Sequence, residues 1–169
     1  MSAVWHPCGS PPGGACVLVP ASMRLDNEVR LTRLRDVLNQ VVKPARWPQT
    51  RQVTVTARHL HGEPVAFAEA VAGPFEPFAE GDRWGPDWDT TWFHIEGEVP
   101  SEWVGNDVAL VVHLGYDGGT GFGAEGLVWV DGEPLQGISP HHREIPIAGP
   151  AEGGEHVDLY IEAAANPPA

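Results

Sequence analysis

Tryptophan and acidic residues are concentrated in residues 84–103, the part of the sequence best suited to binding a sugar. Four of the chain's seven tryptophans lie there, and Asp87 and Asp89 flank Trp88. Aromatic rings can cover the C–H faces of a sugar, while carboxylates accept hydrogen bonds from its hydroxyl groups. The same side chains also build protein cores. For the loop at residues 84–88 we therefore favour internal packing first, contact with a neighbouring domain second and glycan binding third.

Carboxylates two positions apart raise the question of glycoside hydrolysis. The pairs are Asp87 and Asp89, Glu96 and Glu98, and Asp131 and Glu133. A glycosidase needs two carboxylates that face each other across the sugar, roughly 5 Å or more apart. A segment this acidic offers many accidental pairs, so the sequence assigns no catalytic residue.

The histidines offer a possible metal pair in His59 and His61, since alternate residues of a strand point to the same side. A zinc site needs three or four converging ligands, and no cysteine, third histidine or flanking aspartate in the local sequence completes the set. His141 and His142 are adjacent, so their side chains diverge on an extended chain. We therefore expect surface roles for all four histidines, and no metal or cofactor in this chain.

Short segments of period two, separated by turn residues, must position these groups. With 20 Gly and 17 Pro the chain favours many turns over long helices. Asp131-Gly132 is the clearest hairpin turn, because a type I′ turn needs positive φ at both central positions. Strands are predicted at residues 53–58, 64–70, 90–98, 108–114, 126–130, 134–138, 143–147 and 156–162. Eight short strands predict a mainly β fold, a two-sheet sandwich of the jelly-roll type.

The strand at residues 90–98 divides the aromatic residues between two faces. Phe93 and Ile95 share one face and are predicted to lie in the core. Trp92 lies on the other face, with His94, and is expected to be either a half-buried cover for the sandwich or an interface residue.

One amphipathic α-helix is predicted before the strands, with the apolar residues Leu31, Leu34, Leu38 and Val41 on one stripe and Pro44 at its end. An isolated helix of this length is marginal in water, so the stripe must pack on something. Docking on the domain's own sheet, and docking on another domain or a second subunit, are left as equal alternatives.

The charge is distributed unevenly between the helical segment and the rest. The formal net charge is −13. Residues 24–58 hold eight basic and three acidic residues, a balance of +5, whereas residues 59–169 hold two basic and twenty acidic residues, a balance of −18. So acidic a surface repels phosphate backbones and anionic lipid, which excludes nucleic acid and membranes as partners of the larger half. The basic segment is suited to an acidic neighbour, including another part of its own polypeptide.

The first residues of the chain carry both cysteines, Cys8 and Cys16, in a Pro/Gly-rich stretch. A sandwich without cysteine is typical of a reducing compartment, and no stretch approaches the roughly 20 apolar residues that span a bilayer. We therefore predict a cytoplasmic protein. The expected organisation is a disordered leader at 1–23, a helix and linker at 24–47, a β-sandwich at 48–165 and a linker at 166–169. An over-extended gene start is one explanation of the leader.

Several short motifs, all in order, resemble the N-terminal β-sandwich domain of glycoside hydrolase family 38 α-mannosidases. The match covers roughly residues 24–166. The motifs are Trp84-Gly85-Pro86, Thr91-Trp92-Phe93, Val99-Pro100 with Glu102-Trp103, Glu125-Gly126-Leu127-Val128, Asp131-Gly132, Leu135-Gln136-Gly137 and Glu162 to Pro167.

This resemblance implies a galactose-binding-like jelly roll beside a zinc-dependent catalytic domain that removes α-linked mannose with retention of configuration. The zinc ligands and the aspartate nucleophile of that domain follow this region, so no catalytic residue carries over. The expected partners are that catalytic domain or other subunits, with mannose-containing glycans as the alternative of a free-standing lectin-like module. An interaction protein that assembles through its basic helix is a third possibility. The candidate contacts with a glycan or a neighbouring domain are Trp84, Asp87, Trp88, Asp89, Trp92, Glu125 and Gln136.

Overall fold

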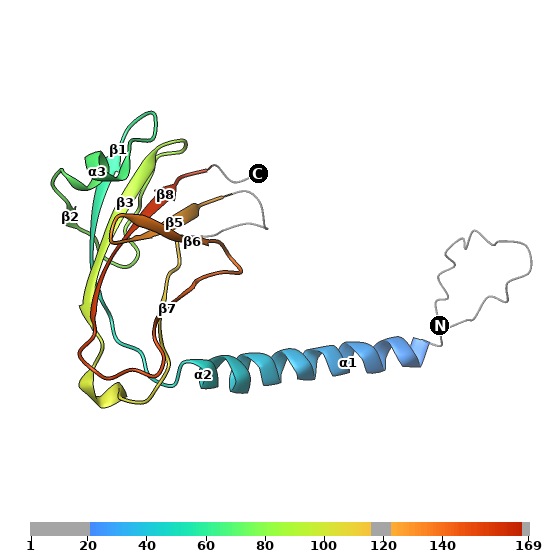
Figure 1. Ribbon diagram of the computed structural model, residues 1–169. Helices are drawn as coiled ribbons and strands as arrows, with labels where there is room; N and C mark the ends of the chain where they lie inside the picture. Colours follow the sequence, from blue (N-terminus) through green and yellow to red (C-terminus); the bar gives the residue numbers. More distant parts are fainter. Residues whose placement is uncertain (1–20, 116–122, 167–169) are drawn as a thin grey trace, which may run out of the picture. The chain divides into compact units, whose positions relative to one another are not determined.

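The computed structural model describes residues 21–115 and 123–166 of the 169-residue chain. The chain divides into two compact units, residues 1–51 and residues 52–169. The first contains the helical segment and the second contains the strands (Figure 1). The leader predicted at residues 1–23 lies almost entirely outside the described residues.

The described part of the first unit contains a helix with a π turn inside it. It comprises α1 (Ala21–Val37), the π-helical turn η1 (Leu38–Val42) and α2 (Lys43–Arg46). The prediction that Pro44 ends the helix is wrong by two residues. A proline inside an α-helix lacks the donor N–H and its ring clashes with the carbonyl four residues earlier. Here the wider turn precedes it, and the N–H of Lys43 bonds to the Leu38 carbonyl instead.

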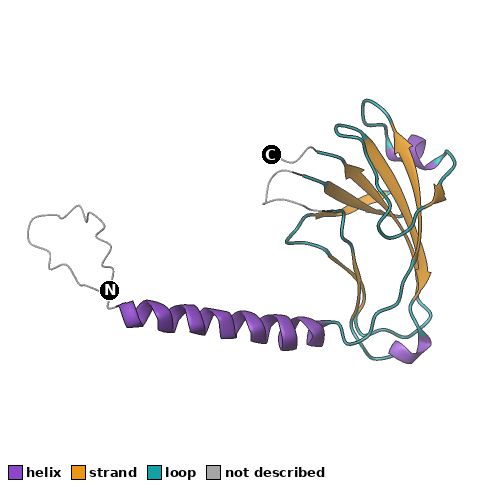
Figure 2. Ribbon diagram, turned by 180° about the vertical axis from the view of Figure 1, so that it is seen from behind, coloured by secondary structure: helices purple, strands orange, loops and turns teal. Residues whose placement is uncertain are grey.

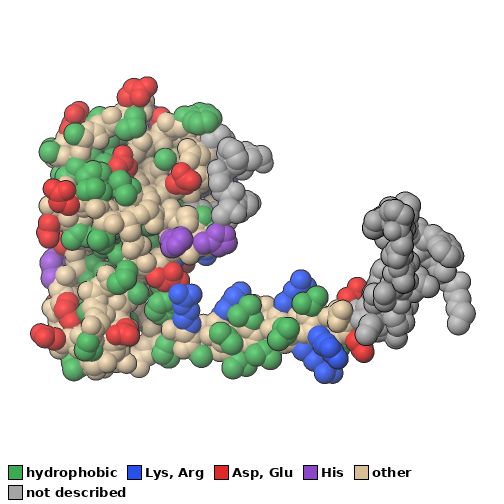
Figure 3. Space-filling model, turned by 45° about the vertical axis from the view of Figure 1, so that its right-hand side comes forward, with side chains coloured by type: hydrophobic (Ala, Val, Ile, Leu, Met, Phe, Trp, Pro, Cys, Tyr) green, Lys and Arg blue, Asp and Glu red, His purple; other side chains and the backbone are tan. Residues whose placement is uncertain are grey.

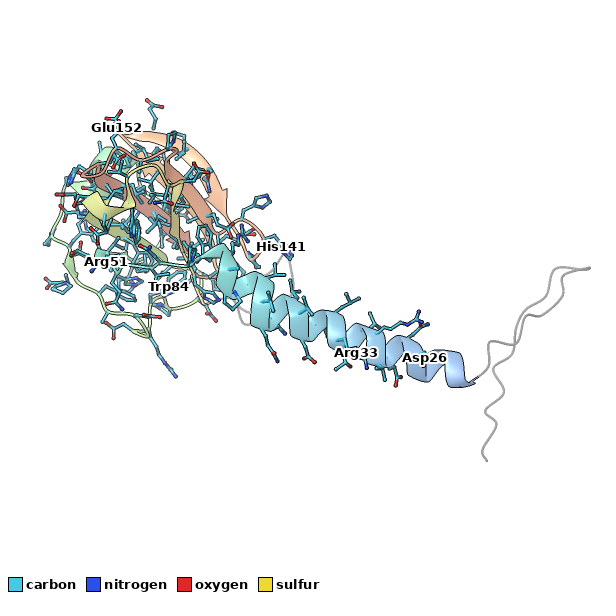
Figure 4. All side chains as sticks on the ribbon, turned by 90° about the horizontal axis from the view of Figure 1, so that it is seen from below. Asp26, Arg33, Arg51, Trp84, His141 and Glu152 are labelled. Carbon is cyan, nitrogen blue, oxygen red and sulfur yellow. The ribbon has the colours of Figure 1, made fainter. Side chains whose placement is uncertain are left out.

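The helix presents its apolar and its basic side chains to solvent. The predicted stripe of Leu31, Leu34, Leu38 and Val41 is between 47% and 65% exposed. Figure 3 shows Lys and Arg side chains along the helix and Asp and Glu side chains over the sandwich. Asp26 and Arg33 both project from the helix in Figure 4. Apart from Arg58, the basic residues of segment 24–58 thus lie in the first unit, and the acidic residues of segment 59–169 lie in the second.

The second unit is an antiparallel β-sandwich, as predicted (Figure 2). Its larger sheet has the order β2-β1-β3-β8-β5-β6, and its smaller sheet pairs β4 with β7. The strands are β1 (Thr54–Leu60), β2 (Glu76–Pro77), β3 (Thr90–Glu98), β4 (Val108–Val111), β5 (Glu125–Val130), β6 (Glu133–Ile138), β7 (Glu144–Ala148) and β8 (His156–Ala164). A 3-10 turn, η2 (Ser101–Trp103), follows β3. Among the described residues, no helix is both long and apolar enough to cross a membrane.

Seven of the eight predicted strands are present and one is wrong. Residues 64–70 contain the short helix α3 (Phe67–Val71) instead of a strand. Its sequence alternates alanine with larger residues, which suggested a strand. Alanine and Glu69 are good helix formers, however, and so short a run does not distinguish the period of a strand from that of a helix. The two-residue strand β2 was not predicted. It pairs with the outer edge of β1, where Pro77 is tolerated because no further strand needs its missing N–H.

The core lies on one face of the large sheet, as the alternation in residues 90–98 predicted. Phe93 and Ile95 of β3 are 5% and 4% exposed, and they pack with Leu159 and Ile161 of β8 and with Ile145 of β7. These side chains come from both sheets. They form the apolar layer between the two sheets that a sandwich needs for stability.

Trp92 is fully buried on the opposite face of the same sheet, so the prediction of a half-buried cover was wrong. The reason is α3, which brings Phe67 over this face. The Phe67 ring lies 5.8 Å from the Trp92 ring, 5.2 Å from the Trp129 ring and 5.5 Å from the Tyr160 ring. A second apolar layer therefore exists beneath α3, and the incorrect strand and the incorrect exposure share one cause.

Candidate functional site

One end of the large sheet brings together four strand ends. The start of β3 at Thr90 pairs with the end of β1 at Leu60 on one side and with the end of β8 at Ala164 on the other. Ala164 also pairs with Glu125, the start of β5. Figure 1 shows the end of β8 beside the start of β5 at this end of the sandwich. We call this region the β3-start end. The loop before β3 carries four of the predicted contact residues, Trp84, Asp87, Trp88 and Asp89.

Trp88 is the most exposed of the tryptophans that the structure describes, at 75%. Its backbone is nevertheless fixed, because its N–H donates to the Ala165 carbonyl at 2.7 Å and the Ala165 N–H donates to the Asp89 carbonyl at 3.0 Å. Its φ of 71° lies in the left-handed region, which is uncommon for a bulky residue and costs roughly 1–3 kcal/mol. A strained backbone therefore holds a large apolar ring out in water.

Asp89 joins the end of β1 to the start of β3. Its Oδ2 lies 2.7 Å from His61 Nδ1 and 3.1 Å from His59 Nε2, and its Oδ1 accepts the Gly62 N–H at 3.3 Å. The Gly62 N–H and the His61 side chain, followed by His59, lower the pKa of the Asp89 carboxyl below its usual value. Asp89 is 28 residues from His61 in sequence, and only the β1–β3 pairing brings them together.

Among the described residues, the side chains of His59, His61 and Asp89 form the group that could hold a metal ion. The sequence singled out His59 and His61 but did not connect them with Asp89. The signal that could have found Asp89 was its place directly before a predicted strand that pairs with the strand of the histidines.

A shallow depression of about 260 Å³ opens on the sheet face that carries Trp92, at the same end. It is lined by Pro64, Thr90, Glu125, Gly126, Leu127, Glu162 and Ala164. The Glu162 carboxylate is already engaged, since it accepts a hydrogen bond from Trp129 Nε1 at 3.2 Å. The volume is below the roughly 300 Å³ at which small-molecule pockets begin. Glu125 is therefore placed beside a surface hollow that is too small to enclose a sugar chain.

The remaining predicted contact residues are divided between solvent and structural contacts. Trp84 is half-buried, packs edge-on against Phe93 at 5.7 Å and donates from Nε1 to the Leu114 carbonyl at 3.1 Å. Gln136 of β6 donates to the Glu144 carbonyl of β7 at 3.0 Å, a bond between the two sheets. Asp87 is exposed. The structure thus gathers Trp88, Asp89 and Glu125 at the β3-start end, while Trp84, Trp92 and Gln136 serve packing.

Comparison with known proteins identifies one domain family. The family model described as "Alpha-mannosidase, jelly roll domain" matches residues 48–169. Human Alpha-mannosidase 2C1 is 36% identical over 118 residues, which cover 68% of this chain and 11% of the human protein. The mouse protein of the same name is 34% identical over 111 residues, and Alpha-mannosidase G of Dictyostelium discoideum is 26% identical over 109 residues. The chain thus spans about a tenth of the length of the curated relatives it matches.

Proposed function

Because the chain belongs to the family of α-mannosidase jelly-roll domains, we propose that it serves such an enzyme as a non-catalytic domain. In this proposal the enzyme is a retaining, zinc-dependent glycoside hydrolase of family 38, and the catalytic zinc is held outside this chain. The jelly roll supports the catalytic portion by packing against it. The observation that carries the proposal is the exposed, backbone-fixed ring of Trp88 at the β3-start end.

The packing role rests on where Trp88 lies. Its N–H bonds to the carbonyl of Ala165, the residue after β8, so the backbone of Trp88 lies beside the end of the last strand. The relatives are about ten times longer than the matched segment, which leaves ample chain to cover this surface. A tryptophan buried at the centre of an interface typically contributes about 2–4 kcal/mol, or roughly 30- to 1,000-fold in affinity.

A chimera of the human relative tests this role, with its matched segment replaced by residues 48–169 of this chain. We expect the chimera to hydrolyse α-mannosides, and we expect Trp88→Ala to lower its thermal stability and its activity together. Leu135→Ala is the matched control, because Leu135 is 56% exposed on β6 and lies away from the β3-start end. An inactive chimera would count against the proposal, and so would a Trp88→Ala chimera that behaves like the Leu135→Ala chimera.

The second candidate function is direct binding of mannose-containing glycans, which the exposure of Trp88 next to Asp87 favours. Millimolar mannobiose should then shift the tryptophan fluorescence of the isolated chain, and Trp88→Ala should abolish the shift. The packing role predicts no shift in either protein. The two candidates therefore give opposite results in one titration.

We also propose a cytoplasmic location for this domain. The support is the cysteine usage: residues 52–169, the whole β-sandwich unit, contain no cysteine, so the unit folds without a disulfide. Fractionation of cells that express the native gene checks this, and recovery in the secreted fraction would contradict it.

A further inference from the structure

We propose that the sandwich binds one divalent transition-metal ion, zinc first, through His59 Nε2, His61 Nδ1 and Asp89 Oδ2. This site is separate from the catalytic zinc that the proposed enzyme would hold outside this chain. The inference goes beyond the packing role of Trp88 and does not depend on it.

The spacing of the three ligand atoms matches one face of a tetrahedral site. Zinc lies roughly 2.0–2.1 Å from nitrogen and about 2.0–2.2 Å from oxygen, so two ligands of one tetrahedral ion are about 3.3 Å apart. The two histidine nitrogens are 3.2 Å apart, and Asp89 Oδ2 lies 3.1 Å from His59 and 2.7 Å from His61. An ion would need to move the ligands by only a few tenths of an ångström.

The two imidazole rings are oriented to converge. Their centroids lie 4.3 Å apart and their planes are at 88°. Perpendicular rings this close cannot stack, but they can direct two ring nitrogens at one point from different sides. His59 lies in β1 and His61 directly follows its last residue, Leu60, so the two histidines are two positions apart, the spacing that brings side chains to one side of an extended chain.

Supporting hydrogen bonds hold the ligands as they do in metal sites. The other ring nitrogen of His59, Nδ1, lies 3.2 Å from the hydroxyl oxygen of Thr91, which is 2% exposed. The oxygen of Asp89 that faces away from the histidines accepts the Gly62 N–H. Metal-bound histidines and carboxylates carry such second partners, which fix the tautomer and the ring orientation. A simple ion pair on the surface needs neither.

The ligand set selects the class of ion. Two imidazoles and one carboxylate suit first-row transition metals, whereas magnesium and calcium prefer oxygen ligands. Zinc binds such ligands more tightly than iron or manganese in the usual order of affinity. Three protein ligands leave a fourth position for water or for a group from outside, and the side chain of His61 is 78% exposed.

A bound ion would make the β3-start end more rigid. It would tie the end of β1 to Asp89, which directly follows Trp88 and is bonded through its carbonyl to Ala165. The loop that presents Trp88 would then be fixed at both its backbone and its side chains.

Zinc titration of the purified, untagged full chain tests the site. Cys8→Ser and Cys16→Ser are included in every protein, so that thiols do not bind the metal. We expect one equivalent of Zn²⁺ with a Kd of about 1 µM or tighter, unchanged by millimolar Mg²⁺, and a higher Tm with zinc than without. Co²⁺ in place of Zn²⁺ should give visible absorption bands on binding.

Two variants of the site and one matched control separate specific binding from the attraction of an acidic surface. His61→Ala and Asp89→Asn should each weaken zinc binding at least about 100-fold, since even supporting residues contribute 10- to 100-fold. Thr91→Val, which removes only a supporting hydroxyl, should weaken zinc binding by about 10- to 100-fold. Asp158→Asn should leave the affinity unchanged, because Asp158 and Glu96 contact opposite ring nitrogens of His94 and so do not converge on one point.

Every other outcome overturns the inference. No stoichiometric binding by the parent chain would show that the three side chains form a hydrogen-bonded cluster only. Equal affinity in the parent chain and His61→Ala, whose exposed side chain leaves folding intact, would place the metal elsewhere. An equal loss in Asp158→Asn would assign the binding to the general negative charge of the sandwich.

Discussion

The second apolar layer beneath α3 leads to a sharp prediction for Phe67→Ala. Phe67 contacts three aromatic rings of the large sheet: Trp92, Trp129 and Tyr160. Truncation of a fully buried phenylalanine costs about 3–5 kcal/mol, and Phe67 is only half-buried. We therefore expect a loss of about 2–3 kcal/mol, which lowers the Tm of a domain of this size by about 8–12 °C.

Thermal unfolding followed by circular dichroism measures this loss, and tryptophan emission gives a second readout. Trp92 is fully buried under Phe67, so the variant should also shift the emission to the red. Leu135→Ala serves as the control and should change the free energy of unfolding by no more than about 0.5 kcal/mol, because Leu135 is largely exposed. A Phe67→Ala protein that melts within about 2 °C of the parent chain would refute the assignment of α3 as the cover of this face.

The remaining predictions concern strain and ionisation. Trp88→Asn should unfold at an equal or higher Tm, because asparagine adopts a positive φ more easily and the Trp88 ring buries little; a fall of several degrees would contradict this. The N–H of Glu152 and the other loop N–H groups lower the pKa of Glu155 below 4.5, so its stabilising effect is complete above pH 4.5 and is lost as the pH falls through the folded pKa. Acid unfolding should therefore depend less on pH in Glu155→Gln than in the parent chain. Burial, and then the charge of Asp158, raise the pKa of Tyr160 above 10.0, so the free energy of unfolding should decline as the pH rises above 10.0. Asp158→Asn should lower this pKa only in part. Phenolate absorbance in a Tyr116→Phe background measures it.

Local pattern was sufficient for most of the sandwich because the residues that face the core recur at every second position of a strand. The strand β3 begins and ends at the residues that alternation predicts, and its core-facing Phe93 and Ile95 are buried. Pattern failed at residues 64–70, where the segment covers the sheet instead of joining it. That contact depends on distant rings of β5 and β8, and no local period records it.

The candidate site was predicted in part for the same reason. Trp88 was identified by residue type and loop context, both of which are local. The convergence of Asp89 on His59 and His61 depends on the register of β1 against β3, which pairs His59 with Thr91. A one-residue slip in that pairing would turn the side chains to opposite faces, so type and spacing alone could not connect the three residues.

As a non-catalytic domain, this α-mannosidase jelly roll is expected to perform no hydrolysis itself. The purified chain, loaded with one equivalent of zinc, is incubated with a nitrophenyl α-mannoside, and release of nitrophenol is followed. We expect a rate equal to that of the buffer blank, in the parent chain and in Asp89→Asn alike. Turnover by the parent chain that disappears in Asp89→Asn would rule out a non-catalytic domain, because the cluster of His59, His61 and Asp89 would then be an active site.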